Sequence, residues 1–304
     1  MSKSIVGARS AGVHHAPITP AQHHFSTPGN HCRLLTQQCY YYTFPGTAVQ
    51  EGRPSHPLRH FLQKTAWTMP VPRPYSCFHL LFCGVGIILV GFLVHILCKK
   101  CYKIPYVPFY GCGLVLALGE LYKQLFLYQI VNQGRYDWWY FPMQLCSTPM
   151  YLCIILIFMH KYSPITRTIC TYLQDFSLLG GIMALAEPSG LMQPYVTLTV
   201  HGLTWHLILI FIGLYCHRCG LAGKSWREYA KTLPLLAVFL AFASIINVAT
   251  HGQADMFYIS PFYPVTQVFF YQVSLLVGTG AGIVFYIFSI CLGGWIIHYC
   301  LGKL

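Results

Sequence analysis

The feature that most constrains this chain is an uncharged stretch from Trp138 to His160. A run of this length without Lys, Arg, Asp or Glu is long enough to cross a bilayer as an α-helix. Its first residues, Trp138-Trp139-Tyr140-Phe141, are typical of the aromatic belt at a membrane surface. Gln144 and Cys146 follow directly, and polar groups at that depth are costly in lipid. The stretch therefore predicts a span that begins at an enclosed polar site.

Composition supports a membrane protein. Of 304 residues, 55% are hydrophobic and 9% charged, whereas soluble domains carry about 25% charged residues. The net charge of +12 would indicate nucleic acid if the basic residues shared one soluble face, but they lie in short loops. We therefore predict an all-α, polytopic transmembrane helix bundle whose partners are membrane lipids, with no nucleic acid and no cofactor.

About seven spans are expected along the chain. Their ranges are Cys77–Cys98, Val107–Val131, Trp138–His160, Ile169–Glu187, Tyr195–Tyr215, Leu233–His251 and Tyr271–Tyr299. The fourth is the most polar, because it contains Gln174, Asp175 and Glu187. The alternative is six spans, with the fourth re-entrant.

Residues 1–70 differ from the transmembrane domain expected at 71–304. They are rich in His, Pro, Gln and Ser and have no apolar periodicity, a composition that cannot bury a core. We expect them to be disordered. Alternatively they are not translated, and the native start is Met69.

Loop charges predict the orientation. One set of loops, with the C-terminus, contains Lys99, Lys100, Lys103, Lys161, Arg167, Arg218, Lys224, Arg227, Lys231 and Lys303. The opposite loops contain only Arg135. Because cytoplasmic loops carry an excess of Lys and Arg, we expect the C-terminus to be cytoplasmic and the N-terminus outside.

This orientation places polar residues of four spans at one depth. The third and fifth spans enter from outside, and the fourth and sixth end there. The residues concerned are Gln144, Cys146, Glu187, His201, Asn247 and His251. Since ionisable residues within a membrane are functional by default, we predict a shared site in the outer half of the bilayer. The alternative is separate helix–helix hydrogen bonds, worth roughly 0.6 kcal/mol each.

Two of these residues are candidates for catalysis. A thiolate nucleophile needs a base within reach, which His201 would provide for Cys146, with Glu187 or Asn247 orienting the imidazole. Gln144, Glu187, Asn247 and His251 would bind substrate. Trp205 lies one helical turn from His201 and suits either a ligand wall or plain packing. Alternatively, Cys146 packs as a small hydrophobe and His201 bonds to a carbonyl.

Other motifs have structural interpretations. Cys98-Lys99-Lys100-Cys101 and Cys216-His217-Arg218-Cys219 have zinc-like spacing, but cysteines at helix ends near a membrane can also be acylated, and we assign no metal site. Glu120 and Lys123 are three residues apart and can pair, with a proton relay as the alternative. Gly278 and Gly282 would form a face for close helix packing.

Four short motifs, in order, resemble the YwaF family of bacterial integral membrane proteins. Phe141–Ser147 is similar to its Pro-Leu-His-Leu-Cys motif, and Leu179–Leu185 resembles its Gly-Gly segment. His201-Gly202 is similar to its His-Gly pair, and Asn247 with Gly252 and Tyr258 to its Asn…Gly-Asn-Tyr segment. The likeness covers about Phe141 to Pro264 and implies a bacterial plasma membrane protein.

The YwaF family has no settled activity to carry over. A eukaryotic relative resembles a phospholipid acyltransferase that uses a Cys and a His. Its Pro-Cys-His motif falls on Pro142, Met143 and Gln144, so both reactive residues are absent there, although Cys146 is nearby and His201 matches a second conserved His. The resemblance implies an acyltransferase-like enzyme acting on lipid or lipid-linked substrates. The alternative is a transporter or ligand-binding membrane module that uses the same polar layer.

Overall fold

The structure, a computed structural model, describes residues 57–161 and 163–303. These residues form helices and turns, with one isolated β-bridge between Thr68 and Tyr195. The α-helices are α2 (Pro57–Lys64), α3 (Cys77–Lys100), α4 (Val107–Phe126), α5 (Thr148–Phe158), α6 (Pro164–Tyr172), α7 (Leu178–Ala186), α8 (Val196–Arg218), α9 (Trp226–Ala230), α10 (Leu233–Ala249), α11 (Val268–Val277) and α12 (Thr279–Lys303). The predicted all-α class is confirmed.

Several short turns extend or connect these helices. Two are π-helical, η1 (Leu127–Val131) and η4 (Leu173–Ser177). Four are 3-10 turns, η2 (Trp138–Tyr140), η3 (Leu145–Ser147), η5 (Ser189–Leu191) and η6 (Met256–Tyr258). Because η4 joins α6 to α7 without a break, these three elements act as one long helix.

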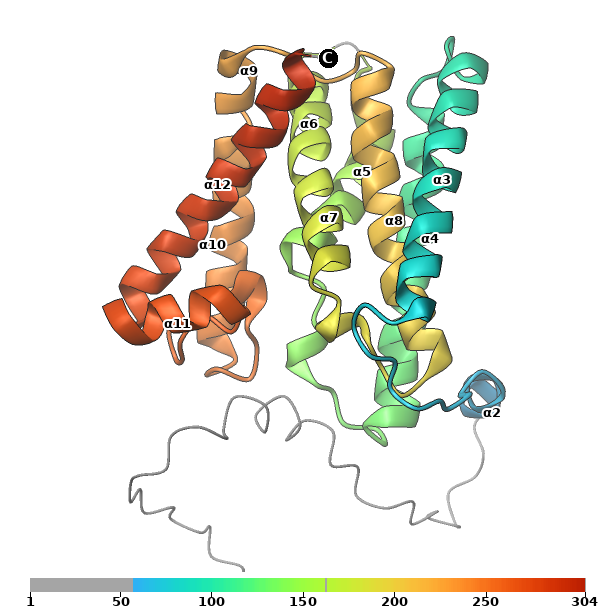
Figure 1. Cartoon of the computed structure of the whole chain (residues 1–304), viewed down its shortest axis with the longest axis vertical. Coiled ribbons are helices and arrows are strands. Elements are labelled where there is room, and N and C mark those ends of the chain that lie inside the picture. Colours follow the sequence, from blue (N-terminus) through green and yellow to red (C-terminus); the bar gives the residue numbers. More distant parts are fainter. Residues whose placement is uncertain (1–56, 162, 304) are drawn as a thin grey trace, which may run out of the picture. The chain divides into compact units, whose positions relative to one another are not determined.

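Within the described residues, six helical segments are long and apolar enough to cross a membrane (Figure 1). They are Cys77–Lys100, Val107–Val131, Pro164–Ala186, Val196–Arg218, Trp226–Ala249 and Thr279–Lys303. The chain is therefore a multi-pass membrane protein. The segment that falls short of this length is the third expected span rather than the fourth, since Pro164–Ala186 is one of the six long helices.

The third expected span is not a continuous helix. Its α-helical part, α5, begins only at Thr148 and has a proline in its first turn. Before it, η2 and η3 are separated by extended backbone around Pro142. Proline has no N–H to donate and disfavours helical backbone in the residue before it, which agrees with the extended Phe141 (φ −58°, ψ 133°). The prediction of one helix from Trp138 to His160 was wrong at its start.

The most enclosed span is one that carries polar side chains in its middle. In Pro164–Ala186, 67% of the apolar window is buried in protein, and in Val196–Arg218 the share is 61%. The other four long segments have 11–28%. A helix surrounded by other helices does not need an apolar surface toward lipid, which explains how it accommodates Gln174 and Asp175 at 3% and 0% exposure.

The last expected span is two helices. Gly278 separates α11 from α12 with φ 87° and ψ 157°, a region of backbone conformation that is essentially restricted to glycine. At Gly282 a Cβ would collide with Ser274, so α11 folds back tightly against α12. Gly278 is therefore a break, and Gly282 packs within this hairpin; the predicted GxxxG face was wrong.

The ordered part begins earlier than residue 71. Leu62 of α2 is buried in a cluster with Phe126, Leu127 and Leu198. The backbone of residues 67–69 then pairs with the segment before α8, through Val196 N to Trp67 O (2.9 Å) and Met69 N to Pro194 O (2.9 Å). The expectation of disorder is thus wrong for residues 57–70, and for residues 1–56 it lies outside the described residues.

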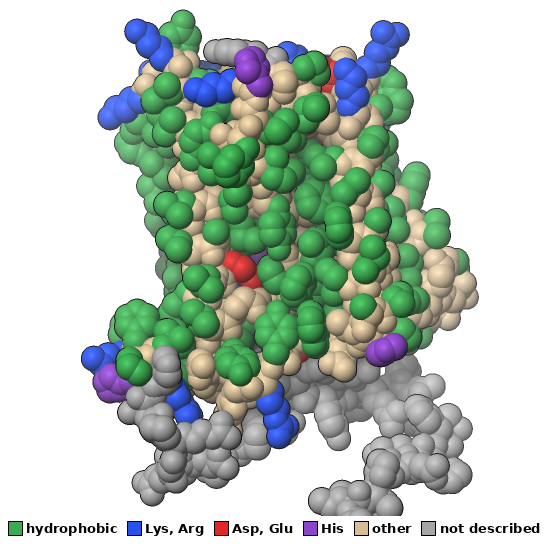
Figure 2. Space-filling view, turned by 180° about the vertical axis from the view of Figure 1, so that it is seen from behind, with side chains coloured by type: hydrophobic (Ala, Val, Ile, Leu, Met, Phe, Trp, Pro, Cys, Tyr) green, Lys and Arg blue, Asp and Glu red, His purple; other side chains and the backbone are tan. Residues whose placement is uncertain are grey.

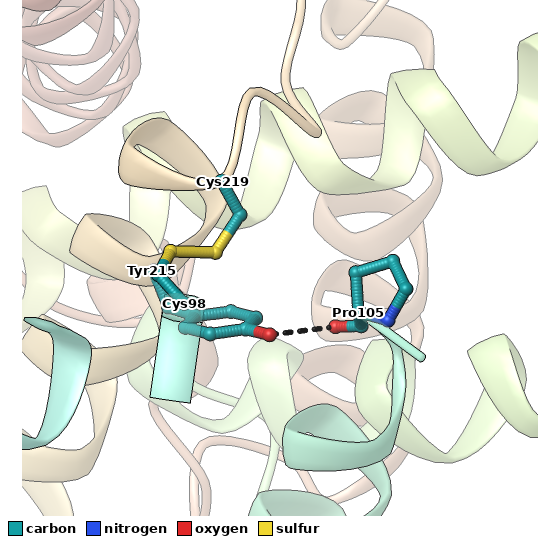
Figure 3. The surroundings of a disulfide bond; sticks show 4 residues. All are labelled: Cys98, Pro105, Tyr215 and Cys219. Atoms are coloured by element: carbon teal, nitrogen blue, oxygen red, sulfur yellow. Dashed lines mark hydrogen bonds between the residues drawn. A yellow bond between two sulfur atoms is a disulfide. The ribbon is translucent and has the colours of Figure 1, made fainter. Parts of the chain in front are cut away.

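Basic side chains mark the two ends of the bundle, with an apolar surface between them (Figure 2). We call the end formed by the C-terminal ends of α3, α8 and α12 the basic end. The two CxxC motifs lie there, and a disulfide between Cys98 and Cys219 joins α3 to α8 (Figure 3). Beside it, Tyr215 OH donates to the carbonyl of Pro105 at 3.1 Å. The disulfide links one cysteine from each motif.

Candidate functional site

The break before α5 places Gln144 and Cys146 on backbone that is not α-helical. Asp137 accepts a hydrogen bond from Trp139 N at 3.0 Å, which fixes the start of η2. Tyr151 OH donates to the carbonyl of Pro142 at 2.7 Å and satisfies one acceptor of the break. Irregular backbone at membrane depth is tolerated only where it is buried in protein or lines a cavity. The break is therefore expected at a site rather than on a lipid-facing surface.

Two adjacent glycines on α7 face two different neighbours. A Cβ at Gly180 would lie 3.8 Å from Cys146 Cα. A Cβ at Gly181 would lie 2.9 Å from the carbonyl oxygen of His206 on α8, too close for any other residue. The Gly-Gly pair thus brings the Cys146 turn and α8 against the same helix.

His201 is reached from Cys146 through Trp205. Trp205 Nε1 donates to the carbonyl oxygen of Cys146 at 3.0 Å. The rings of His201 and Trp205 lie 5.5 Å apart between centroids. Gly119 of α4 leaves room for the imidazole, since a Cβ there would be 3.3 Å from His201 Cε1. We call Gln144, Cys146, His201 and Trp205 the polar site.

Gln144 has one polar atom without a partner in the described part of the chain. Its Nε2 donates to the carbonyl of Asp255 at 2.8 Å. Its Oε1 is buried and has no hydrogen-bond partner. A buried acceptor without a donor is costly, and a ligand hydroxyl or amine would satisfy it.

Three residues of α4 form a polar network near His201, and the sequence predicted two of them, Glu120 and Lys123, as a pair with a proton relay as the alternative. Lys123 Nζ lies 2.9 Å from Glu120 Oε2. Gln124 Nε2 donates to Glu120 Oε1 at 2.7 Å and to the carbonyl of Tyr140 at 2.6 Å. This network ties α4 to the turn before the break. Its closeness to His201 depends on how α4 and α8 pack, which the sequence did not signal.

Asn247 holds the loop between α10 and α11. Its Nδ2 donates to the carbonyl of Met256 at 3.0 Å, and its Oδ1 accepts from Met256 N at 2.6 Å. The next two residues, Phe257 and Tyr258, have φ of 55° and 57°, a strained conformation for aromatic residues. Asn247 thus fixes the turn at Met256. The residue before this turn, Asp255, accepts the hydrogen bond from Gln144 with its backbone carbonyl.

Asp255 is a buried carboxylate in this loop. Its Oδ1 accepts from Ser260 N at 3.1 Å and its Oδ2 from Thr266 Oγ1 at 2.9 Å. Burial raises the pKa of Asp255 to about 6, although both hydrogen bonds lower it. The loop over the polar site therefore contains a group that titrates near neutral pH.

The structure brings some of the predicted residues together and places others apart. Gln144, Cys146, His201 and Trp205 are linked as described above. Glu187 is exposed and accepts a hydrogen bond from the Ser189 hydroxyl. His251 is exposed with φ 50° at the end of α10. Asn247 is fully buried in its loop contacts.

Comparison with known proteins identifies the family. A family model described as the TMEM164 family matches residues 73–292. The chain belongs to the TMEM164 family. The match covers α3 to α11, most of α12, and every residue of the polar site of this TMEM164-family protein. No curated protein and no solved structure matches it.

Proposed function

We propose that this TMEM164-family protein is a membrane-embedded enzyme that acts on lipid or lipid-linked substrates by acyl transfer at the polar site. The observation that carries the proposal is the bond from Trp205 to the Cys146 carbonyl, with His201 beside the same indole. The backbone of Cys146 and the ring of His201 thus contact the same indole, which supports pairing of the thiol with the imidazole. The motif likeness to the YwaF family, with its acyltransferase-like eukaryotic relative, supports the same chemistry.

The reaction has two steps. His201 takes the proton of the Cys146 thiol while the thiolate attacks the carbonyl carbon of a lipid ester. The ester C–O bond breaks, the departing alcohol receives the proton, and the acyl group remains on Cys146 as a thioester. In the second step the hydroxyl of an acceptor lipid attacks the thioester. His201 takes the hydroxyl proton and returns it to the sulfur.

Gln144 has a binding role in this proposal. Its Oε1 would accept a hydrogen bond from the acceptor hydroxyl and orient it toward the thioester, since this atom is buried and has no partner among the described residues. Met143 and Gln144 stand where the acyltransferase motif has its Cys and His. The proposal therefore assigns the nucleophile to Cys146 rather than to the motif position.

Acyl transfer is tested with purified protein in vesicles. A phospholipid with an isotope-labelled acyl chain is supplied with an unlabelled lysophospholipid, and mass spectrometry follows the label. Wild type should move label to the acceptor, and without acceptor it should carry a hydroxylamine-sensitive acyl group on Cys146. Cys146→Ser and His201→Ala should each lower the rate at least about 100-fold. Cys83→Ser, a half-buried cysteine on α3, is the matched control.

The outcomes separate the alternatives. Saturable lipid binding without label transfer, unchanged by Cys146→Ser, would indicate a ligand-binding module. Net movement of a substrate across the vesicle membrane would indicate a transporter. Unchanged label transfer in folded Cys146→Ser protein would exclude this nucleophile.

We propose, on the charge distribution, that the basic end faces the cytoplasm, and, on the likeness to the YwaF family, that the membrane is a bacterial plasma membrane. The polar site then lies in the outer half of the bilayer and the C-terminus inside. The ten Lys and Arg residues of the basic-end loops support this orientation.

A further inference from the structure

A pocket of about 220 Å³ lies at the basic end, away from the polar site. It is formed by the loop before α9, the start of α9 and the last turns of α12, which lie side by side in Figure 1. Its lining residues are Lys224, Trp226, Trp295, His298, Tyr299, Gly302 and Lys303. We call it the basic-end pocket.

The walls of the basic-end pocket are held by partly buried hydrogen bonds and a close backbone approach. His298 Nε2 contacts the carbonyl of Ser225 at 3.1 Å, and Tyr229 OH donates to the carbonyl of Cys291 at 2.5 Å. At Gly302 a Cβ would lie 3.3 Å from the carbonyl of Lys224, so the loop and α12 approach closely. The pocket is therefore part of the folded framework.

The floor of the basic-end pocket is electrically neutral. Both ring nitrogens of His298 face acceptors, Asp175 Oδ2 at 2.9 Å and Ser225 O at 3.1 Å. A neutral imidazole has only one N–H and can donate to only one of these acceptors. His298 and Asp175 together therefore hold one proton more than a neutral imidazole with an ionised carboxylate would. Whichever residue carries this proton, the pair has no net charge and does not repel an anion.

The rim of the pocket is cationic and aromatic. The ammonium groups of Lys224 and Lys303 are exposed, and among the described residues neither is paired with a carboxylate. The acidic residue of α9, Glu228, is already bound by Arg167, with 2.6 Å between Nε and Oε1. Lys303 Nζ lies 5.4 Å from the centroid of the Tyr299 ring. Two free cations beside aromatic rings form a site for a phosphate anion at a membrane surface.

An apolar stripe on α12 continues from the pocket along the membrane-spanning part. Exposed side chains recur at helical spacing at Val284, Phe288, Leu292, Trp295 and Tyr299. The rings of Trp295 and Tyr299 stack at 5.7 Å, next to the cations. A ligand with an anionic head and long apolar chains matches both parts, whereas a soluble phosphate compound matches only the first.

We propose that the basic-end pocket binds the phosphate headgroup of one anionic phospholipid, whose acyl chains lie along the exposed stripe of α12. Lys224 and Lys303 contact the phosphate, and Trp226, Trp295 and Tyr299 enclose the glycerol region. This site is separate from the polar site and does not depend on acyl transfer there.

Native mass spectrometry of the detergent-solubilised full chain tests this site. Phosphatidylglycerol and phosphatidylcholine are titrated separately. Wild type should retain one phosphatidylglycerol in preference to phosphatidylcholine, and added salt should weaken this binding. The double variant Lys224→Gln/Lys303→Gln should bind phosphatidylglycerol about 10- to 30-fold more weakly. All the substituted side chains are exposed, so the variant should fold.

The matched control is Lys99→Gln/Lys100→Gln, two exposed lysines at the basic end that lie outside the pocket. It should bind phosphatidylglycerol as wild type does. Equal loss of binding in both double variants would overturn the site, because it would reflect general surface charge. Equal retention of phosphatidylcholine, or full displacement by inorganic phosphate or glycerol phosphate, would overturn the assignment to an anionic lipid.

Discussion

The polar site and the basic-end pocket are built in opposite ways. The polar site depends on irregular backbone, on Gly181, which admits a close neighbour, and on partly buried hydrogen bonds. The basic-end pocket is lined by exposed cations and aromatic rings on regular helix and a short loop. Chemistry requires reacting groups held within a fraction of an ångström, whereas charge attraction tolerates mobile side chains. The difference fits the two proposals, acyl transfer at the polar site and lipid binding at the basic-end pocket.

The largest effect is expected from Asp175, which supports the floor of the basic-end pocket. In Asp175→Ala the His298 ring keeps only one of its two hydrogen-bond acceptors, the carbonyl of Ser225. The substitution also removes one partner of a buried pair. Breaking such a pair costs about 3–5 kcal/mol. Thermal unfolding in detergent should show a large fall in the midpoint temperature.

The control for this substitution is Glu187→Ala. Glu187 is exposed and its carboxylate accepts a hydrogen bond from the neighbouring Ser189, so the change should stay within about 0.5 kcal/mol. Equal losses of stability in Glu187→Ala and Asp175→Ala would contradict the expectation that the buried Asp175–His298 pair contributes more than the exposed Glu187.

The second effect concerns pH and the loop over the polar site. Because burial raises the pKa of Asp255 to about 6, the folded protein binds a proton more tightly than the unfolded chain. Stability should therefore fall as pH rises from about 4 to 6, by up to about 3 kcal/mol.

Asp255→Asn isolates this contribution. The variant should lack the fall in stability between pH 4 and 6, as measured by thermal unfolding across that range. The prediction would be contradicted if wild-type stability rose between pH 4 and 6 and Asp255→Asn abolished that rise. The pKa of Asp255 would then be lower in the folded protein than in the unfolded chain.

The third effect separates two adjacent glycines of the polar site. Gly181→Ala must displace the His206 carbonyl or Ile210, and overpacking of this kind costs about 1–3 kcal/mol. Gly180→Ala makes only ordinary contacts near 3.8 Å and gains helix propensity of up to about 1 kcal/mol. Opposite signs in the unfolding temperature are expected. Equal effects would mean that α7 and α8 are not closely packed there.

Parts of the fold differ in how far the sequence predicts them. The long spans were predictable because lipid contact selects apolar composition directly. The break at Pro142 also had a local signal, the missing N–H and the restricted residue before it. The break at Gly278 had no such local signal, because a glycine within a span is compatible with close helix packing and also with a helix break.

The candidate site was less accessible from sequence. The Gln144 bond to Asp255 and the Asp175 bond to His298 join residues 111 and 123 positions apart. Such pairs depend on how helices pack, which no local periodicity encodes. Shared depth in the membrane grouped Cys146 with His201 but also included Glu187 and His251, which are exposed at helix ends.

The smallest effect on stability is expected from reduction of the disulfide between Cys98 and Cys219. A disulfide stabilises mainly by restricting the unfolded chain, and insertion in the membrane already restricts that chain. Its oxidation state instead tests orientation. If the basic end is cytoplasmic, Cys98 and Cys219 should be reduced in resting cells and oxidised on treatment with diamide. Non-reducing gels after rapid alkylation measure this. Labelling of Cys219 by an impermeant reagent from outside would reverse the assigned orientation.

The bond between Cys98 and Cys219 also has a consequence for biosynthesis. The two cysteines are 121 residues apart, and at a translation rate of 5–20 residues per second the second follows the first after roughly 6–24 s. During that interval α3 has no covalent tie to α8, which is not yet made. The two cysteines can therefore meet only after every helix from α3 to α8 has been made.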